Sequence, residues 1–202
     1  MTVASRPSPS SVAIGVTGHR ALTDADRVDA GLDEVVRRLE QAYPDQWTVV
    51  SALAEGADRL VARRMLAREG TRLVAVLPLA RDDYETDFAT EASRREFAEL
   101  LDLADEVVHT PPQPSRDEAY EAAGQTVIAR ADALIAVWDG RDAQGVGGTD
   151  AIVAAARTRG LPLVWIHAGS RTPDTLEPTS LGDAQGAVTV ERIPQVGQRD
   201  GP

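Results

Sequence analysis

VAIGVTGHRALTDADRVDAGLDEVVRRLEQAYPDQWTVVSAL, residues 12–53, has the pattern of a strand, a helix and a second strand. Residues 12–18 and 47–53 are almost continuously apolar and rich in β-branched side chains, which is typical of strands covered on both faces. Between them, 23–43 carries apolar side chains at helical spacing after Thr23 and Asp24, two candidate N-caps. The apolar face consists of Val28, Leu32, Val35, Val36 and Leu39.

The same alternation continues along the chain. Further apolar runs lie at 72–78, 105–110, 133–140 and 161–167. Further helical patterns lie at 56–70, 91–104, 115–131 and 149–160. Strands that alternate with helices predict an α/β fold: a doubly wound, mostly parallel, Rossmann-like sheet with helices on both faces and right-handed crossovers.

The chain divides into three parts by composition. Residues 1–10 are rich in Ser and Pro and are expected to form a disordered tail. Residues 11–168 are expected to form the Rossmann-like, nucleotide-binding domain. Residues 169–202 form a loop-rich C-terminal extension, in which 187–193 has the pattern of a short strand.

Composition excludes several classes of function. A net charge of −11 disfavours coating of DNA or RNA, although a local site for one phosphate stays open. The chain has no cysteine and three histidines without a metal-ligand spacing, so we expect neither a metal site nor a cofactor. Without an apolar stretch of membrane-spanning length or a signal peptide, a cytoplasmic protein is expected.

In an open parallel sheet, ligands bind beyond the carboxyl ends of the strands. The first strand ends in GVTGHR, where Gly15, Thr17, Gly18, His19 and Arg20 are candidate ligand-binding residues. The glycines allow a tight turn whose N–H groups face an anion, with Arg20 as its countercharge. The alternative is a compact strand-to-helix turn with a solvated arginine and a structural histidine.

The second strand leads into SALAEGADRL, with Glu55, Gly56 and Asp58 at a predicted helix start. The two carboxylates are candidates for binding ribose hydroxyls or a base. Helix capping is the structural alternative for both.

The third strand leads into PLARDDYETDF, a weaker candidate site. There Tyr84 or Phe88 would cover a ring and Arg81 would reach a phosphate. Surface packing explains these side chains equally well.

The fifth strand leads into WDGRDAQGVGGTD, where Asp139 precedes a glycine-rich loop and a helix. The bare backbone exposes amides at a helix N-terminus, where a phosphate is the natural occupant. A flexible loop with Thr149 or Asp150 as N-cap is the alternative. The ligand- or phosphate-binding candidates in this segment are Asp139, Gly145, Gly147, Gly148 and Thr149. Neither a P-loop nor a GxGxxG or GxSxG motif is present.

Taken in order, GVTGHR, SALAEGADRLVA, VLPL…DDYETDF, ADALIAVWDG and GVGGTDAIVAAARTRGLPLVWI resemble the SLOG superfamily over residues 12–167. This group of Rossmann-like domains is named for the Smf/DprA DNA-uptake and Lonely-guy cytokinin-activating proteins. The likeness is greatest to small bacterial members of largely unassigned function. It implies a nucleotide-type ligand whose phosphate is held by the glycine-rich loop.

Lonely-guy enzymes cleave the N-glycosidic bond of nucleoside 5′-monophosphates with a PGGxGTxxE motif. Here the glycines and Thr149 match, but the Pro is missing and Ile152 replaces the catalytic Glu. Isoleucine cannot act as an acid or base. Asp150 would point about 200° away around the helix, so it is a poor substitute.

Three hypotheses therefore stay open. The first is a binding or sensor domain for a nucleotide-type ligand. The second is an enzyme that cleaves an N-glycosidic or phosphate bond, with Glu55, Asp58 or Asp139 as the acid or base. The third is an assembly module whose glycine loop packs against a partner subunit. We also expect a homo-oligomer, most simply a dimer, and no membrane partner.

Overall fold

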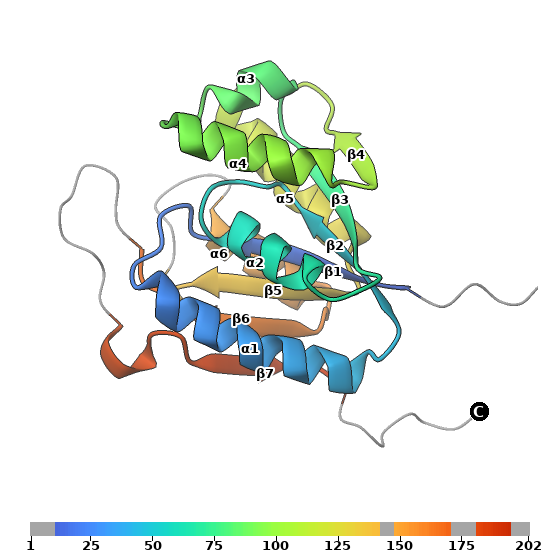
Figure 1. Cartoon of the computed structure of the whole chain (residues 1–202), viewed down its shortest axis with the longest axis vertical. Coiled ribbons are helices and arrows are strands. Elements are labelled where there is room, and N and C mark those ends of the chain that lie inside the picture. Colours follow the sequence, from blue (N-terminus) through green and yellow to red (C-terminus); the bar gives the residue numbers. More distant parts are fainter. Residues whose placement is uncertain (1–10, 142–147, 171–180, 195–202) are drawn as a thin grey trace, which may run out of the picture.

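The computed structural model describes residues 11–141, 148–170 and 181–194 of the 202-residue chain. These residues form a seven-stranded sheet of order β4-β3-β2-β1-β5-β6-β7, with helices packed on it (Figure 1). The strands are β1 (Ser11–Gly18), β2 (Gln46–Ser51), β3 (Arg72–Leu77), β4 (Glu106–His109), β5 (Ala133–Trp138), β6 (Leu163–His167) and β7 (Val188–Glu191). All strand pairs are parallel except β6 with β7, so the predicted α/β fold is confirmed.

Helices cover both faces of the sheet. α1, α2 and α4 contribute to one buried cluster, and α5 and α6 contribute to those on the opposite face. Figure 1 shows α1 and α2 in front of the sheet and α6 behind it. The helices are α1 (Ala25–Ala42), α2 (Ala57–Leu66), α3 (Arg81–Glu85), α4 (Glu91–Asp102), α5 (Arg116–Arg130) and α6 (Thr149–Thr158), with a 3-10 turn η1 (Gly182–Ala184).

The central strand β5 explains why the sequence is apolar without alternation. All six of its residues are buried. Ile135 and Val137 belong to the cluster under α1 and α2, whereas Leu134, Ala136 and Trp138 pack with α6. Successive side chains point to opposite faces, and both faces are covered, so every position is apolar.

Helix α1 buries the apolar face predicted from its spacing. Val28, Leu32, Val35 and Leu39 are buried, and Val36 is half-buried. Asp24 is the N-cap residue, as predicted, but its side chain makes no cap hydrogen bond and its φ of 50° is left-handed. Its carboxylate lies 3.4 Å from Nε of Arg27 instead.

The segment before β7 packs on α1. A Cβ on Gly31 would lie 2.6 Å from the carbonyl oxygen of Gly186, and Gly186 in turn lies against the backbone of Arg27. The N–H of Gly186 donates to the carbonyl oxygen of His167 at 2.7 Å. Residues 181–191 are thus joined both to the sheet and to its first helix.

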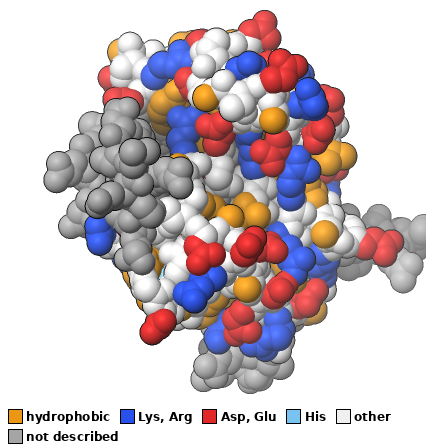
Figure 2. Space-filling view, turned by 60° about the vertical axis from the view of Figure 1, so that its left-hand side comes forward, with side chains coloured by type: hydrophobic (Ala, Val, Ile, Leu, Met, Phe, Trp, Pro, Cys, Tyr) orange, Lys and Arg blue, Asp and Glu red, His pale blue; other side chains and the backbone are white. Residues whose placement is uncertain are grey.

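Most arginines of the described chain pair with a carboxylate. On the face shown in Figure 2, basic and acidic side chains are interspersed. All 21 basic residues of the chain are arginines.

No helix in the described part of the chain has both the length and the apolar character needed to cross a membrane.

Candidate functional site

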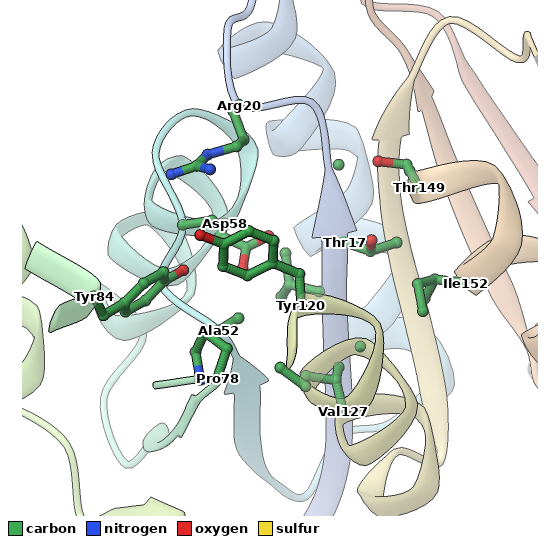
Figure 3. A pocket seen from close by; sticks show the side chains of 15 residues that line it. Thr17, Arg20, Ala52, Asp58, Pro78, Tyr84, Tyr120, Val127, Thr149 and Ile152 are labelled. Carbon is green, nitrogen blue, oxygen red and sulfur yellow. The ribbon is translucent and has the colours of Figure 1, made fainter. Parts of the chain in front are cut away.

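A cavity of about 160 Å³ opens at the carboxyl ends of β1, β2 and β3, beside α5 and the start of α6 (Figure 3). The sheet order reverses between β1 and β5, so the cavity lies where Rossmann-like sheets bind ligands. Six residues proposed from the sequence line it, namely Thr17, Gly18, Arg20, Asp58, Tyr84 and Thr149.

Arg20 differs from the other arginines of the structure. Each of the other arginines in ranges 11–141, 148–170 and 181–194 binds a carboxylate or a backbone carbonyl oxygen. Among the described residues, the guanidinium of Arg20 contacts the ring of Tyr120, with Cζ 5.8 Å from the ring centroid, and forms no ion pair or hydrogen bond. A positive charge without a carboxylate partner is therefore available at the mouth of the cavity.

The start of α6 faces Arg20 across the opening, as Figure 3 shows for Thr149. The N-cap residue Gly148 is extended, and no side chain caps the helix. No described residue accepts a hydrogen bond from the N–H groups of Thr149, Asp150 or Ala151, and the first amides of a helix have no partner within it. Within the described part of the chain these N–H groups therefore have no acceptor; Gly145 and Gly147 lie outside the described residues.

Asp58, in the first turn of α2, is a buried carboxylate in the cavity wall and is 5% exposed. Ser51 Oγ donates to its Oδ2 at 3.1 Å. Burial raises the pKa of Asp58 to about 6, although Ser51, nearby backbone N–H groups and the charge of Arg20 all act to lower it. This carboxyl group therefore titrates much closer to neutrality than an ordinary aspartate.

The loop before α2 is held in an unusual conformation. Leu53 is buried with a left-handed φ of 55°, and its N–H donates to Ser51 Oγ at 3.0 Å. Its carbonyl oxygen accepts from Nε of Arg59 at 2.9 Å. The buried guanidinium of Arg59 stacks on Phe88, with Cζ 4.2 Å from the ring centroid. These contacts fix the loop that presents Asp58 to the cavity.

Two tyrosines form the wall opposite the sheet. Tyr84 of α3 is 2% exposed and packs edge-to-face against Phe88 and Phe97. Tyr120 of α5 binds Asp87 through its hydroxyl, and Arg116 pairs with the same carboxylate at 3.0 Å. This network joins α5 to the segment after β3 and sets the distance between the two rings.

The third wall of the cavity is apolar. Ile152 is 3% exposed and packs where α5 has Gly124, since a Cβ there would lie 2.9 Å from Cγ1 of Ile152. Ile152 lines the cavity, so a hydrocarbon side chain forms this part of its wall.

The glycines of the first two loops serve close packing. A Cβ on Gly15 would lie 3.0 Å from Val127 and Ala131. On Gly18 it would lie 2.5 Å from the carbonyl oxygen of Val137. Gly56, with φ of 76°, packs against the backbone of His19 and Arg20. Of these glycines, only Gly18 also lines the cavity.

The other polar candidates bind within the protein rather than line the cavity. His19 Nε2 accepts from the N–H of Asp139 at 3.1 Å and lies 3.3 Å from Oδ1 of the same residue. Glu55 accepts a hydrogen bond from Ser93 Oγ. Arg81, a candidate for the third loop, pairs with Glu85 at 2.8 Å.

Sequence reasoning missed Tyr120 and the role of Ser51. Tyr120, Ala123, Gly124 and Val127 follow helical spacing, so they share a face, and all four line the cavity. An aromatic residue followed by small ones on one helix face was the available signal. Nothing in the sequence linked Ser51 to Asp58.

No protein-family model matches the chain, and no curated protein sequence matches it. Among solved structures, that of the Chlamydomonas rheinhardtii Moco carrier protein is similar to it, with 17% sequence identity and a TM-score of 0.41. The alignment covers 77% of this chain and 76% of that chain.

Proposed function

We propose that the protein binds a nucleotide or nucleotide-derived ligand in this cavity and acts as a sensor or binding domain. The observation that carries the proposal is Arg20, an arginine at the cavity mouth that lacks the carboxylate or carbonyl partner of the other described arginines. The guanidinium of Arg20 can therefore bind an anionic group such as a phosphate without breaking an ion pair to a described residue.

The start of α6 supplies the other half of the anion site. Its first amides, which have no acceptor among the described residues, and its positive dipole end favour negative charge. The hydroxyls of Thr17 and Thr149 have no hydrogen-bond partner among the described residues and line the same space. Cation, amides and hydroxyls together are the groups that bind phosphate oxygens.

The likeness to SLOG domains supports a nucleotide rather than another anion. The matching features are the order of the loops after the strands and the glycines that lead to Thr149. Ile152 in place of the motif's glutamate favours binding over phosphoribohydrolase chemistry.

A second candidate function is hydrolysis of the N-glycosidic bond of a nucleoside monophosphate. One observation favours it: Asp58 lines the cavity, and burial raises its pKa to about 6, which suits a proton donor near neutral pH. Glu55 and Asp139, the other acid or base candidates, do not line the cavity and are bound elsewhere.

The test is a calorimetric titration with AMP, GMP, CMP and UMP and with the corresponding nucleosides. A sensor binds at least one monophosphate with micromolar affinity, binds its nucleoside at least about tenfold more weakly, and returns the ligand intact on chromatography. Release of free base establishes the hydrolase instead. Binding of none of these compounds contradicts both functions.

A further inference from the structure

Tyr84 carries a hydroxyl that no described residue uses as a hydrogen-bond partner. The side chain is 2% exposed, yet no described residue forms a hydrogen bond with Oη. The ring is fixed by Phe88 and Phe97, with centroids 5.0 and 5.5 Å away. Figure 3 shows the hydroxyl pointing into the cavity. A hydroxyl that faces a cavity and has no partner among the described residues is available to bind a ligand.

Asp58 faces the same space. Figure 3 shows the side chains of Asp58 and Tyr84 at the same cavity, which both residues line. The two groups interact electrostatically, since burial and then the charge of Asp58 raise the pKa of Tyr84. Ser51 holds one carboxylate oxygen from behind. The cavity thus offers a hydrogen-bond donor next to an acceptor, both on rigid supports.

The surfaces around this pair suit a flat ring. Tyr120 and Pro78 flank the space, and Val16, Ala52 and Val127 line its inner part. These apolar groups would leave the hydroxyls of a buried sugar without partners. A nucleobase has apolar faces and a polar edge with adjacent donors and acceptors. At about 160 Å³, the cavity is smaller than pockets that enclose drug-sized ligands, so it encloses one part of a nucleotide.

We propose that Tyr84 and Asp58 are the residues that determine base recognition: Tyr84 Oη donates a hydrogen bond to an acceptor on a nucleobase edge, and a neighbouring donor on that edge binds the Asp58 carboxylate. This inference rests on the proposed function, because the phosphate of the same ligand lies at Arg20 and the start of α6. The base then lies between α3 and α5, and the sugar spans the opening.

The decisive variant is Tyr84→Phe, which removes the hydroxyl and keeps the packed ring. Because that hydroxyl has no partner in the protein, the melting temperature should stay equal or rise. Binding of AMP, GMP, CMP, UMP and ribose 5-phosphate is measured by calorimetry for wild type and variant. The tightest nucleotide should lose about tenfold in affinity, and ribose 5-phosphate should lose none.

Tyr43→Phe is the matched control, since Tyr43 does not line the cavity, and it should change no affinity. Equal losses for nucleotide and ribose 5-phosphate in Tyr84→Phe, or no loss for either, overturn the base-recognition proposal. The base-recognition proposal is also overturned if wild-type protein binds ribose 5-phosphate as tightly as every nucleotide. That result would still agree with a phosphate site at Arg20. Wild-type protein that binds none of the five compounds overturns the proposed function itself.

Discussion

Gly56 packs its Cα against the carbonyl oxygen of Arg20. The contact joins the loop after β2 to the loop after β1, and the N–H of Ala57 donates to the carbonyl oxygen of His19 at 3.0 Å beside it. A side chain at position 56 would overlap this backbone, so the glycine keeps Arg20 and Asp58 on the same side of the cavity.

Gly56→Ala should destabilise the protein by at least about 2 kcal/mol, because the φ of 76° is strained for alanine and the new Cβ meets backbone atoms. Gly160→Ala is the matched control. Gly160 has a similar φ of 70° with open space around it. The free energy of unfolding of Gly160→Ala should therefore fall only by the cost of the strained backbone conformation, about 1 kcal/mol. Urea unfolding measures both, and equal losses would show that the contact with Arg20 is unimportant.

Asp58→Asn should remove a pH dependence of stability. The pKa of Asp58 rises from 3.8 to about 6 on folding, so between these values the folded state holds a proton that the unfolded state has lost. The stabilisation is complete below pH 4 and is lost as the pH rises through 6. From pH 4 to 7, the unfolding free energy of wild type should therefore fall relative to the variant by up to about 3 kcal/mol.

Asp105→Asn gives the opposite sign and serves as a control. A hydrogen bond from the N–H of Leu73, followed by Arg72, holds the pKa of Asp105 below its ordinary value. Its contribution to stability is present above the unfolded pKa and is lost as the pH falls through the folded one. If both variants change the pH profile in the same direction, the assigned environment of Asp58 is wrong.

Arg20→Gln should weaken binding of the tightest nucleoside monophosphate by about 10- to 100-fold, since it removes a charged hydrogen bond to phosphate. The melting temperature should not change, because the guanidinium has no ion pair in the described structure. Arg72→Gln, which loses the ion pair with Asp105 far from the cavity, should leave the affinity unchanged. An Arg20 variant with wild-type affinity would contradict the phosphate site.

Gly124→Ala should disturb the apolar wall, since the added Cβ would overlap the side chain of Ile152. Overpacking of this kind costs about 1–3 kcal/mol. Ile152→Val removes the overlapping methyl group, so the double variant should recover at least about 1 kcal/mol relative to the sum of the single changes. Additive losses of unfolding free energy in urea would mean that α5 and α6 move apart to make room for the added Cβ.

The order of elements was predictable from the sequence because it depends on periodicity. Strand β5 and helix α1 show continuous and helical apolar patterns that match their burial. The five-residue helix α3 was not predicted, since a single turn has too few residues to show a period. Its stability comes from packing of Tyr84 against side chains that are distant in sequence.

Only some of the residues that line the cavity were predictable from the sequence. The rule that ligands bind beyond the carboxyl ends of parallel strands located Thr17, Arg20, Asp58 and Thr149, which all line the cavity. It could not separate glycines that face a cavity from glycines that pack inside the protein, against side chains as Gly15 does or against backbone as Gly56 does. That distinction depends on contacts between loops far apart in sequence, which spacing within one loop does not contain.

Every residue that lines the cavity falls between positions 16 and 152, whereas the strand that completes the sheet, β7, lies at Val188–Glu191. During synthesis, the residues that line the cavity are therefore made before the strand that pairs with β6 and before the segment that packs on α1. The lining of the cavity is thus encoded apart from the strand that closes this edge of the sheet.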